Sequence, residues 1–304
     1  MSFCSQLKEE LCTIRTSECC TVAQCYGMML FGRSFSYKEI SLVSENREVV
    51  RRYLSLLHKN FGVAPGEEIL GKKVLSYRVR LQNPAECTRV LSAFGYRGED
   101  SLHINRDVFK RDCCLSAFIR GAFLACGQMS DPNRNYHAEF VIRDLVLAME
   151  LERILKERGL SPLRSMRANR TVLYFSRLET VMELLGAMNA SKNVFALMDV
   201  EVTKTIRNRE NRKSNSEIGN IGKQVEASLK VIRAIERLEQ SEKLELLPPP
   251  LYRVAILRKE HPDASLTELC RLCEEPLTRS GLNHRLARIL AEAEKLPKEA
   301  EESK

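Results

Sequence analysis

The sequence predicts an α+β fold in which a duplicated unit fills the first two thirds of the chain and a small all-helical domain follows. Two observations support it: a self-match at an offset of 94 to 97 residues, and three short helical patterns after Pro248-Pro249-Pro250. With 304 residues, the chain is long enough for several compact domains, each with its own core. We place the domains at 1–198 (repeats 1–103 and 104–198), 199–247 and 248–304.

The repeat is clearest where each copy closes a helix with glycine. The apolar spacing predicts helices over 46–61 and 144–158, followed by Gly62 and Gly159. Glycine is preferred there because it lacks a Cβ and adopts the left-handed conformation without strain. The same 97-residue offset aligns Pro65 with Pro162, Tyr77 with Tyr174, Arg80 with Arg177, and Leu81 with Leu178.

Upstream, Gly27 matches Gly121 at an offset of 94, so we expect three extra residues in the loop at 130–135 of the second copy. Each copy reads as helix, strand, helix, strand pair, helix. In the second copy these begin with a helix over 112–126 and a strand over 137–143. Duplicated units usually pack about a pseudo-twofold axis, which would bring the Gly27 and Gly121 helices into close backbone contact.

The central segments 25–32 (CYGMMLFG) and 118–127 (FIRGAFLACG) resemble the paired helices of LAGLIDADG homing endonucleases, and the order of elements agrees. The resemblance implies a duplicated αββαββα-type domain whose central helices end in metal-binding acids. Here Gly32 and Cys126 occupy those positions. Glycine offers no ligand and a thiol is too soft for Mg²⁺, so we expect no catalytic residue, no metal and no nuclease activity.

A domain of this kind without the acids, joined to a C-terminal helix-turn-helix, is typical of the WhiA regulators, and the chain resembles that family over nearly its whole length. The most specific segments are 118–131 with 137–140, 207–212 with Asn215, Glu217 and Asn220, and 280–286. The resemblance implies a bacterial transcription regulator at promoters on the nucleoid. Sporulation, cell division and chromosome segregation are the implied processes, and other regulators or RNA polymerase are candidate partners.

Charge and cysteine content are consistent with an intracellular DNA-binding protein. The chain has 48 Lys and Arg against 40 Asp and Glu, a formal charge of +8 that suits a polyanion. The sequence shows neither a signal segment nor an apolar run near the roughly 18 residues of a membrane span, so we expect a cytoplasmic protein without a membrane partner. No phosphate loop or nucleophile motif indicates a small-molecule substrate.

The eleven cysteines are an odd number, and we expect them to be reduced. Those at 19–20, 113–114 and 126 lie in apolar stretches, where a thiol acts as a small hydrophobe. Cys270 and Cys273 have the spacing of half a zinc site, but no second pair follows. We interpret them as core residues and expect no cofactor.

The segment 199–247 predicts a basic linker, with a loop first and then a helix over 225–238. Residues 204–233 hold eight basic side chains against three acids, and Gly219 and Gly222 weaken a helix at the centre. Arg207, Arg209 and Arg212 are candidate DNA contacts. A solvated hinge is the alternative interpretation of this composition.

The last domain predicts three helices: 251–259, one starting at Ser265 with Glu268 completing a capping box, and 278 to about 295. In the third, Leu282, Leu286, Ile289 and Leu290 form the buried stripe. The opposite face presents Ser280, Asn283, His284, Ala287, Arg288 and Ala291, with Arg279 and Arg285 at its margins.

The polar members of this face and the two marginal arginines are our candidate contacts to double-stranded DNA, because Asn pairs with adenine and Arg with guanine in the major groove. A purely structural cap is the alternative for the domain. For the whole chain, the alternatives are an interaction scaffold anchored on the nucleoid and a residual LAGLIDADG-type endonuclease.

Overall fold

The computed structural model describes residues 2–71, 75–97 and 101–296. The chain divides into two compact units, Met1–Thr205 and Ile206–Lys304. Within the described ranges, no helix has the length and apolar character needed to cross a membrane.

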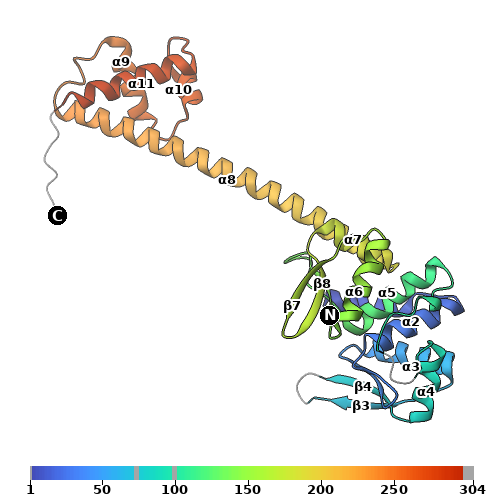
Figure 1. Ribbon diagram of the computed structural model, residues 1–304. Helices are drawn as coiled ribbons and strands as arrows, with labels where there is room; N and C mark the ends of the chain where they lie inside the picture. The colour runs from blue at the N-terminus through green and yellow to red at the C-terminus, as the bar shows by residue number, and fades with distance from the viewer. Residues whose placement is uncertain (1, 72–74, 98–100, 297–304) are drawn as a thin grey trace. The chain divides into compact units, whose positions relative to one another are not determined.

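The first unit contains two copies of the same run of elements after helix α1 (Phe3–Thr13). The first copy comprises α2 (Glu18–Leu30), β1 (Ser34–Phe35), β2 (Ile40–Ser44), α3 (Arg47–Phe61), β3 (Gly66–Leu70), β4 (Ser76–Leu81) and α4 (Pro84–Ala93). A short 3₁₀ helix, η1 (Arg106–Val108), precedes the second: α5 (Asp112–Cys126), β5 (Gly127–Met129), β6 (Ala138–Ile142), α6 (Leu145–Glu157), β7 (Leu163–Arg167), β8 (Arg170–Phe175) and α7 (Leu178–Ala187). This order confirms the αββαββα duplication that the resemblance implies (Figure 1). The element pattern predicted from the residues lacked one strand in each copy, β1 and β5.

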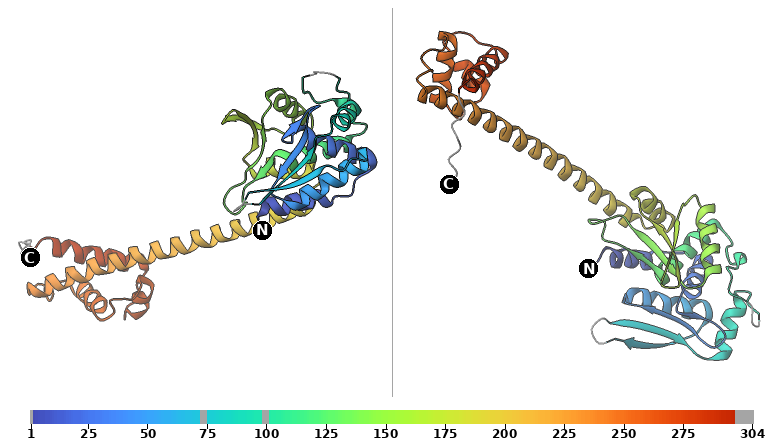
Figure 2. Two further views of the ribbon diagram at one scale, coloured as in Figure 1. Left: turned by 90° about the horizontal axis from the view of Figure 1, so that it is seen from below. Right: turned by 60° about the vertical axis from the view of Figure 1, so that its left-hand side comes forward.

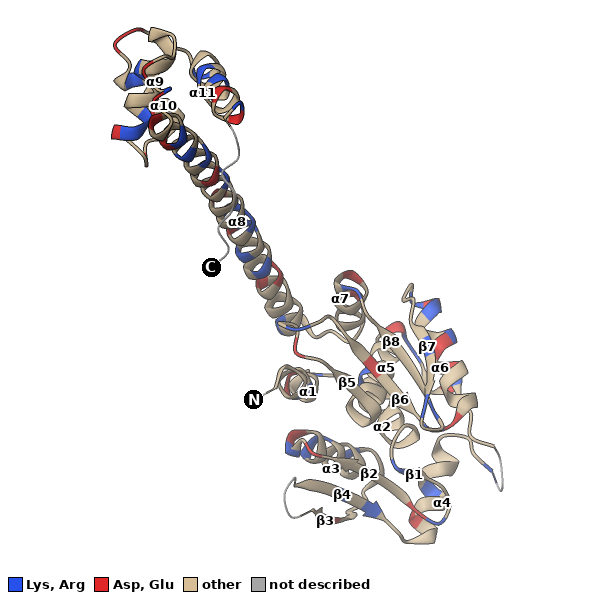
Figure 3. Cartoon of the chain, turned by 90° about the vertical axis from the view of Figure 1, so that its left-hand side faces the viewer, with Lys and Arg blue, Asp and Glu red and all other residues tan. Residues whose placement is uncertain are grey.

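Each copy forms one antiparallel sheet, with strand orders β1-β2-β4-β3 and β5-β6-β8-β7. Helix α3 packs on β2 and β4, and α6 packs on β6 and β8. Helices α2 and α5 lie between the two sheets (Figure 3). One hydrophobic core therefore runs through both repeats, and α2 and α5 are at its centre.

The two central helices touch at their glycines, as predicted. A Cβ on Gly27 would lie 2.4 Å from the carbonyl oxygen of Phe118, and one on Gly121 would lie 2.2 Å from that of Gln24. Real Cβ atoms do not approach backbone so closely, so any side chain at either position would push the repeats apart.

The structure corrects part of the repeat alignment. Pro65 and Pro162 do correspond, because they directly precede β3 and β7. Arg80, however, lies inside β4, whereas Arg177 follows β8 as the N-cap of α7. The strands β4 and β8 match at an offset of 94, so the matches of Tyr77, Arg80 and Leu81 at 97 were wrong.

The reason is a second length difference, in the hairpins. Strands β7 and β8 are joined by only Ala168 and Asn169, both with positive φ, as a tight two-residue hairpin turn requires. Five residues, 71–75, join β3 and β4. The loop between β5 and β6 has four extra residues rather than the predicted three, so β2 and β6 match at an offset of 98. The offset is 97 at β3 and β7, and the shorter hairpin brings it back to 94 at β4 and β8.

Helix α8 (Ser191–Gln240) begins in the first unit, where α1 caps it. The Glu10 carboxylate accepts hydrogen bonds from the backbone N–H of Lys192 (2.7 Å) and of Asn193 (2.9 Å). A carboxylate at a helix N-terminus satisfies otherwise unpaired donors and opposes the positive end of the helix dipole.

The loop that distinguishes the second repeat also contacts α8. Tyr136 Oη donates to Glu201 at 2.5 Å, and Lys204 Nζ donates to the carbonyl of Pro132 at 2.5 Å. The Lys204 ammonium lies 4.2 Å from the centroid of the Tyr136 ring. The inserted loop therefore helps to hold the first part of α8 against the first unit.

The predicted loop in the middle of the linker was wrong, because α8 is one uninterrupted helix through Gly219 and Gly222 (Figure 2). Every residue from 205 to 227 is exposed. Glycine costs a helix about 0.5–1 kcal/mol relative to alanine, a penalty that lowers helix stability but does not forbid the helix.

The second unit is all-helical, and the end of α8 is part of its core. Val231, Ile235 and Leu238 of α8 pack with α9 (Pro249–Glu260), α10 (Leu266–Leu272) and α11 (Arg279–Glu294). The predicted capping box of Ser265 and Glu268 is present.

A buried arginine supports the turn before α10. Arg258 is 4% exposed, and its Nη1 donates to the carbonyl of Ala264 at 2.6 Å. Burial lowers the pKa of Arg258. Charged donors on backbone carbonyls hold such a turn firmly, because losing them would leave the carbonyls unpaired.

Candidate nucleic-acid interface

Helix α11 has the two faces that its sequence predicts. Leu282, Leu286 and Ile289 are buried against the other helices, and Leu290 is half-buried. The exposed face consists of Ser280, Asn283, His284, Ala287, Arg288 and Ala291. The two alanines leave room for close approach, and the four polar side chains supply donors and acceptors.

The start of α11 is open to an anion. Thr278 Oγ1 accepts the N–H of Gly281 at 3.1 Å, and the connection from α10 is the six residues 273–278. Arg279 is exposed, and within the described ranges no acid pairs with Arg279 or Arg288. An uncompensated arginine at a positively polarised helix end is suited to a phosphate.

Arg285 differs from the other candidates because it already lies close to an acidic side chain of the same unit. Its side chain is 25% exposed and lies 3.9 Å from Glu275, which also pairs with Arg253 at 3.1 Å. Arg285 is therefore held against the α10–α11 turn.

The three linker arginines are all exposed, but the helix separates them. Arg209 and Arg212 are three residues apart and share a face, whereas Arg207 is two residues from Arg209 and points about 200° away around the axis. Figure 3 shows the basic residues along α8 and α11. In the described part of the chain, none of the three pairs with an acid.

Arg207 shares its side of α8 with an apolar stripe. By helical spacing the exposed side chains of Ile218, Ile221 and Val225 lie on the side opposite Arg209 and Arg212. A single DNA backbone along α8 would therefore meet Arg209 and Arg212 but not Arg207.

The ends of α2 and α5 that would carry the nuclease acids open into a pocket of about 1250 Å³. A Cβ on Gly32 would lie 2.7 Å from the carbonyl oxygen of Ser41, so the turn there excludes a side chain. Burial raises the pKa of the Cys126 thiol to about 12, which keeps it protonated. Neither residue offers a ligand to a hard divalent cation.

The surroundings of this pocket are basic. Arg33, Arg143 and Arg170 line it, and Arg143 Nη1 donates to the carbonyl of Arg33 at 2.9 Å. Burial and then the positive charges of Arg33 and Arg170 lower the pKa of Arg143. The pocket therefore repels a metal cation and attracts an anion.

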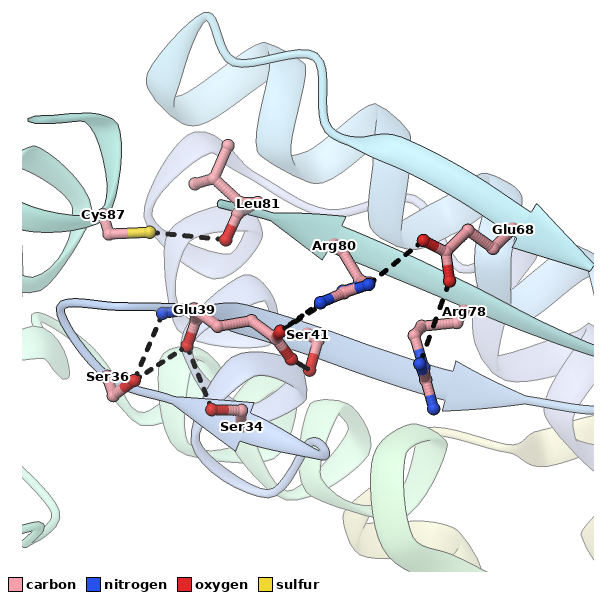
Figure 4. A network of polar contacts seen from close by, with 9 residues as sticks. All are labelled: Ser34, Ser36, Glu39, Ser41, Glu68, Arg78, Arg80, Leu81 and Cys87. Atoms are coloured by element: carbon pink, nitrogen blue, oxygen red, sulfur yellow. Dashed lines mark hydrogen bonds and ion pairs between the residues drawn. The ribbon is translucent and has the colours of Figure 1, made fainter. Parts of the chain in front are cut away.

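Figure 4 shows a contrasting region on the first sheet, where the charges are balanced. Arg80 Nη2 lies 2.9 Å from Glu39 and its Nη1 lies 3.1 Å from Glu68. Ser41 Oγ donates to Glu39 at 2.6 Å, and the Ser41 and Arg80 hydrogen bonds lower the pKa of Glu39. The arginines of this network are therefore neutralised by acids, unlike those that line the pocket.

One cluster of cysteines was not predicted from the sequence. The structure brings Cys19, Cys20, Cys113 and Cys114 together, with all four sulfur atoms within 4.8 Å of one another. The signal was available, because the two Cys-Cys pairs repeat at the 94-residue offset. Cys270 and Cys273, by contrast, pack half-buried in the core of the second unit, in agreement with our interpretation of that pair.

Fold and site together define a class of protein: a duplicated LAGLIDADG-type domain without its paired acids, followed by a helix-turn-helix domain. Two family models match, the WhiA LAGLIDADG-like domain over residues 115–207 and the WhiA C-terminal HTH domain over residues 211–293. The chain is also 31% identical over 309 residues to the Probable cell division protein WhiA of Ruminiclostridium cellulolyticum, covering 98% of this chain and 99% of that protein. It belongs to the WhiA family, which confirms the resemblance seen in the sequence.

Other relatives agree. The Probable cell division protein WhiA of Desulforudis audaxviator is 33% identical over 305 residues, covering 95% of this chain and 96% of that protein. The crystal structure of full-length DUF199/WhiA from Thermatoga maritima matches with a TM-score of 0.56 and 22% identity, covering 98% of this chain and all of that one. The structural match supports the fold.

Proposed function

We propose that this protein is a sequence-specific DNA-binding transcription regulator that reads duplex DNA with α11 and does not cut it. The observation that carries the proposal is the exposed face of α11. Here Asn283, His284 and Arg288 lie on the same side as the small Ala287 and Ala291, opposite the buried apolar stripe. Asn and Arg make the bidentate contacts that distinguish adenine and guanine in the major groove. The relatives carry the name Probable cell division protein WhiA, which places them in cell division.

In this proposal, arginines beside the exposed face of α11 contact the DNA phosphates. Arg279 and Arg285 lie beside the face, and Arg209 and Arg212 stand exposed along α8. Such contacts to phosphates position a protein on DNA without carrying sequence information, and they make affinity depend on salt. Arg207 points elsewhere on α8, so it is the weakest member of the candidate set.

In this proposal, residues 1–198 form a LAGLIDADG-like domain, 199–247 a basic linker whose end joins the second core, and 248–304 the reading domain. The protein acts on the nucleoid in the cytoplasm, at promoters of genes for sporulation, cell division and chromosome segregation. Other regulators or RNA polymerase are its expected protein partners.

The absence of nuclease activity follows from the chemistry of the former catalytic end. Cleavage of a phosphodiester needs a metal ion to stabilise charge on the attacking and leaving oxygens. Gly32 and the protonated Cys126 give that ion no ligand, and Arg33, Arg143 and Arg170 oppose its charge. The same arginines suit a DNA phosphate, so this domain retains a means to grip the backbone.

The test is a titration of purified protein into a random-library duplex at several salt concentrations with Mg²⁺ present. Bound DNA is sequenced and cleavage is checked in the same samples. We expect an enriched motif, a steep loss of affinity with salt, and intact DNA.

Two other outcomes would replace the proposal. Binding without any enriched motif would favour a scaffold that only anchors on the nucleoid. Mg²⁺-dependent nicking would restore the endonuclease.

A further inference from the structure

Four cysteines, two from each repeat, converge at the first turns of α2 and α5. Cys19 and Cys20 are the second and third residues of α2, and Cys113 and Cys114 are the second and third of α5. Their four Sγ atoms all lie within 4.8 Å of one another. Within the described parts of the chain, no other group of three or more His, Cys, Asp or Glu side chains is placed to hold a metal ion.

The cluster follows the internal symmetry of the domain. Cys19 and Cys113 are 94 residues apart, as are Cys20 and Cys114, and this is the spacing of the touching glycines Gly27 and Gly121. The cysteines lie at the opposite end of the helix pair from Gly32 and Cys126. The cluster is therefore separate from the former nuclease site.

The spacing fits one tetrahedral ion. Four thiolates at about 2.3 Å from zinc are about 3.8 Å from one another, so the observed sulfurs need to move inward by about 1 Å or less. Thiolate ligands in tetrahedral geometry select zinc over magnesium or calcium. An iron–sulfur cubane would instead place each thiolate on a different iron, and so farther apart.

The local backbone brings two helix N-termini to these sulfurs. Neither α2 nor α5 has a side chain capping its N-terminal N–H groups, and Ser17 Oγ instead lies 3.2 Å from Cys19 Sγ. Two positively polarised helix ends therefore meet at the cluster, with Glu18 and Asp112 in the same first turns. Burial raises the pKa of Cys20 and Cys114, so a bound ion has to displace the protons of these thiols. Cys20 and Cys114 are buried, whereas Cys113 is exposed and leaves a route for an ion.

We propose that Cys19, Cys20, Cys113 and Cys114 form a structural zinc site that fastens the two repeats together at the ends of their central helices. A bound ion cross-links segments 94 residues apart and so adds stability to the first unit. From the sequence alone, these residues are expected to be apolar packing without a metal. The site is independent of DNA recognition by α11.

The test uses the full-length chain purified under reducing conditions without added metal. Elemental mass spectrometry should find one zinc per chain, and cobalt exchanged into the site should give the charge-transfer and d–d bands of tetrahedral thiolate coordination. The double variant Cys19→Ser/Cys113→Ser removes one partly or fully exposed ligand from each helix and should lose both signals.

The matched control is Cys4→Ser/Cys12→Ser, which changes two half-buried cysteines of α1 outside the cluster. It should keep one zinc. A strong chelator should lower the melting temperature of the wild type and of this control, but not that of the cluster variant.

Two results would overturn the site. They are reduced wild-type protein that takes up neither zinc nor cobalt, and unchanged zinc content in the cluster variant. If the cluster variant does not fold, the cobalt spectrum of the wild type decides alone.

Discussion

Asn283 and Arg288 differ from Arg209 and Arg212 in what each side chain would recognise. The first pair stands on the exposed face of α11, and the second pair on the exposed middle of α8. A side chain in the major groove distinguishes bases, whereas one on the backbone senses only charge. Truncating the side chains of the two pairs should therefore affect DNA binding in different ways.

We predict that Asn283→Ala or Arg288→Ala costs about 1–3 kcal/mol of binding and relaxes the preference at one base pair. Arg209→Ala or Arg212→Ala should weaken all sequences alike and reduce the salt dependence. Arg207→Ala serves as the control, because it faces away from Arg209. Sequencing of selected libraries checks this, and a uniform loss for both α11 variants would refute base readout.

Glu39 gives the first unit a pH-dependent contribution. Its pKa is lowered from the ordinary 4.5 by hydrogen bonds from Ser41 and Arg80. A lowered folded-state pKa means that the stabilisation is complete above 4.5 and is lost as pH falls through the folded value.

Glu39→Gln should therefore lower the urea midpoint of the first unit at pH about 7, and the difference from wild type should shrink by pH about 3. Glu67→Gln, an exposed glutamate on β3, is the matched control. A Glu39→Gln deficit that stays constant with pH would show that the carboxylate charge does not contribute.

At the scale of elements, α8 is the segment whose helicity is least supported by packing. From 205 to 227 every residue is exposed, and at Gly219 and Gly222 an added Cβ would meet nothing within 4 Å. Both positions are therefore free of steric cost, and only the conformational freedom of glycine opposes the helix.

We predict that Gly219→Ala/Gly222→Ala raises helical content and slows proteolysis within 205–227, with a gain of about 0.5–1 kcal/mol per site. Gly62→Ala provides the opposite control, because its space is also open but its φ is +64°, so alanine should destabilise it. Circular dichroism and timed proteolysis measure both. No gain from the double alanine would mean that this segment is not helical in solution.

At the scale of the whole molecule, the described residues form two separate hydrophobic cores, one in each unit. Leu151 is fully buried in the first core, and Leu286, 4% exposed, belongs to the second. Deleting most of a buried leucine costs about 2–5 kcal/mol through lost contacts and the cavity left behind.

Leu151→Ala should therefore lower the unfolding transition of the first unit alone, and Leu286→Ala that of the second alone. Hydrogen exchange resolved by segment assigns each transition, and DNA binding should follow the second unit. If both transitions move together in either variant, the two cores unfold as one cooperative system.

The sequence by itself determined the local patterns: the duplication, the glycines at the helix contact, the three helices after Pro248, and the two faces of α11. These features are set by side chains a few positions apart, so periodicity and capping reveal them. It also showed that Gly32 and Cys126 cannot replace the nuclease acids, since a missing ligand is visible without a fold.

Only the tertiary structure decided what depends on contacts between distant residues. The repeat alignment failed beyond the hairpin of β3 and β4 because the matching hairpin is three residues shorter, and only strand register shows that. Helix α8 forms hydrogen bonds with Glu10 and with the loop at 130–135, both far from it in the chain. The cysteine cluster likewise joins two distant pairs, Cys19 and Cys20 with Cys113 and Cys114. Such contacts follow from how the two repeats pack, which no local pattern encodes.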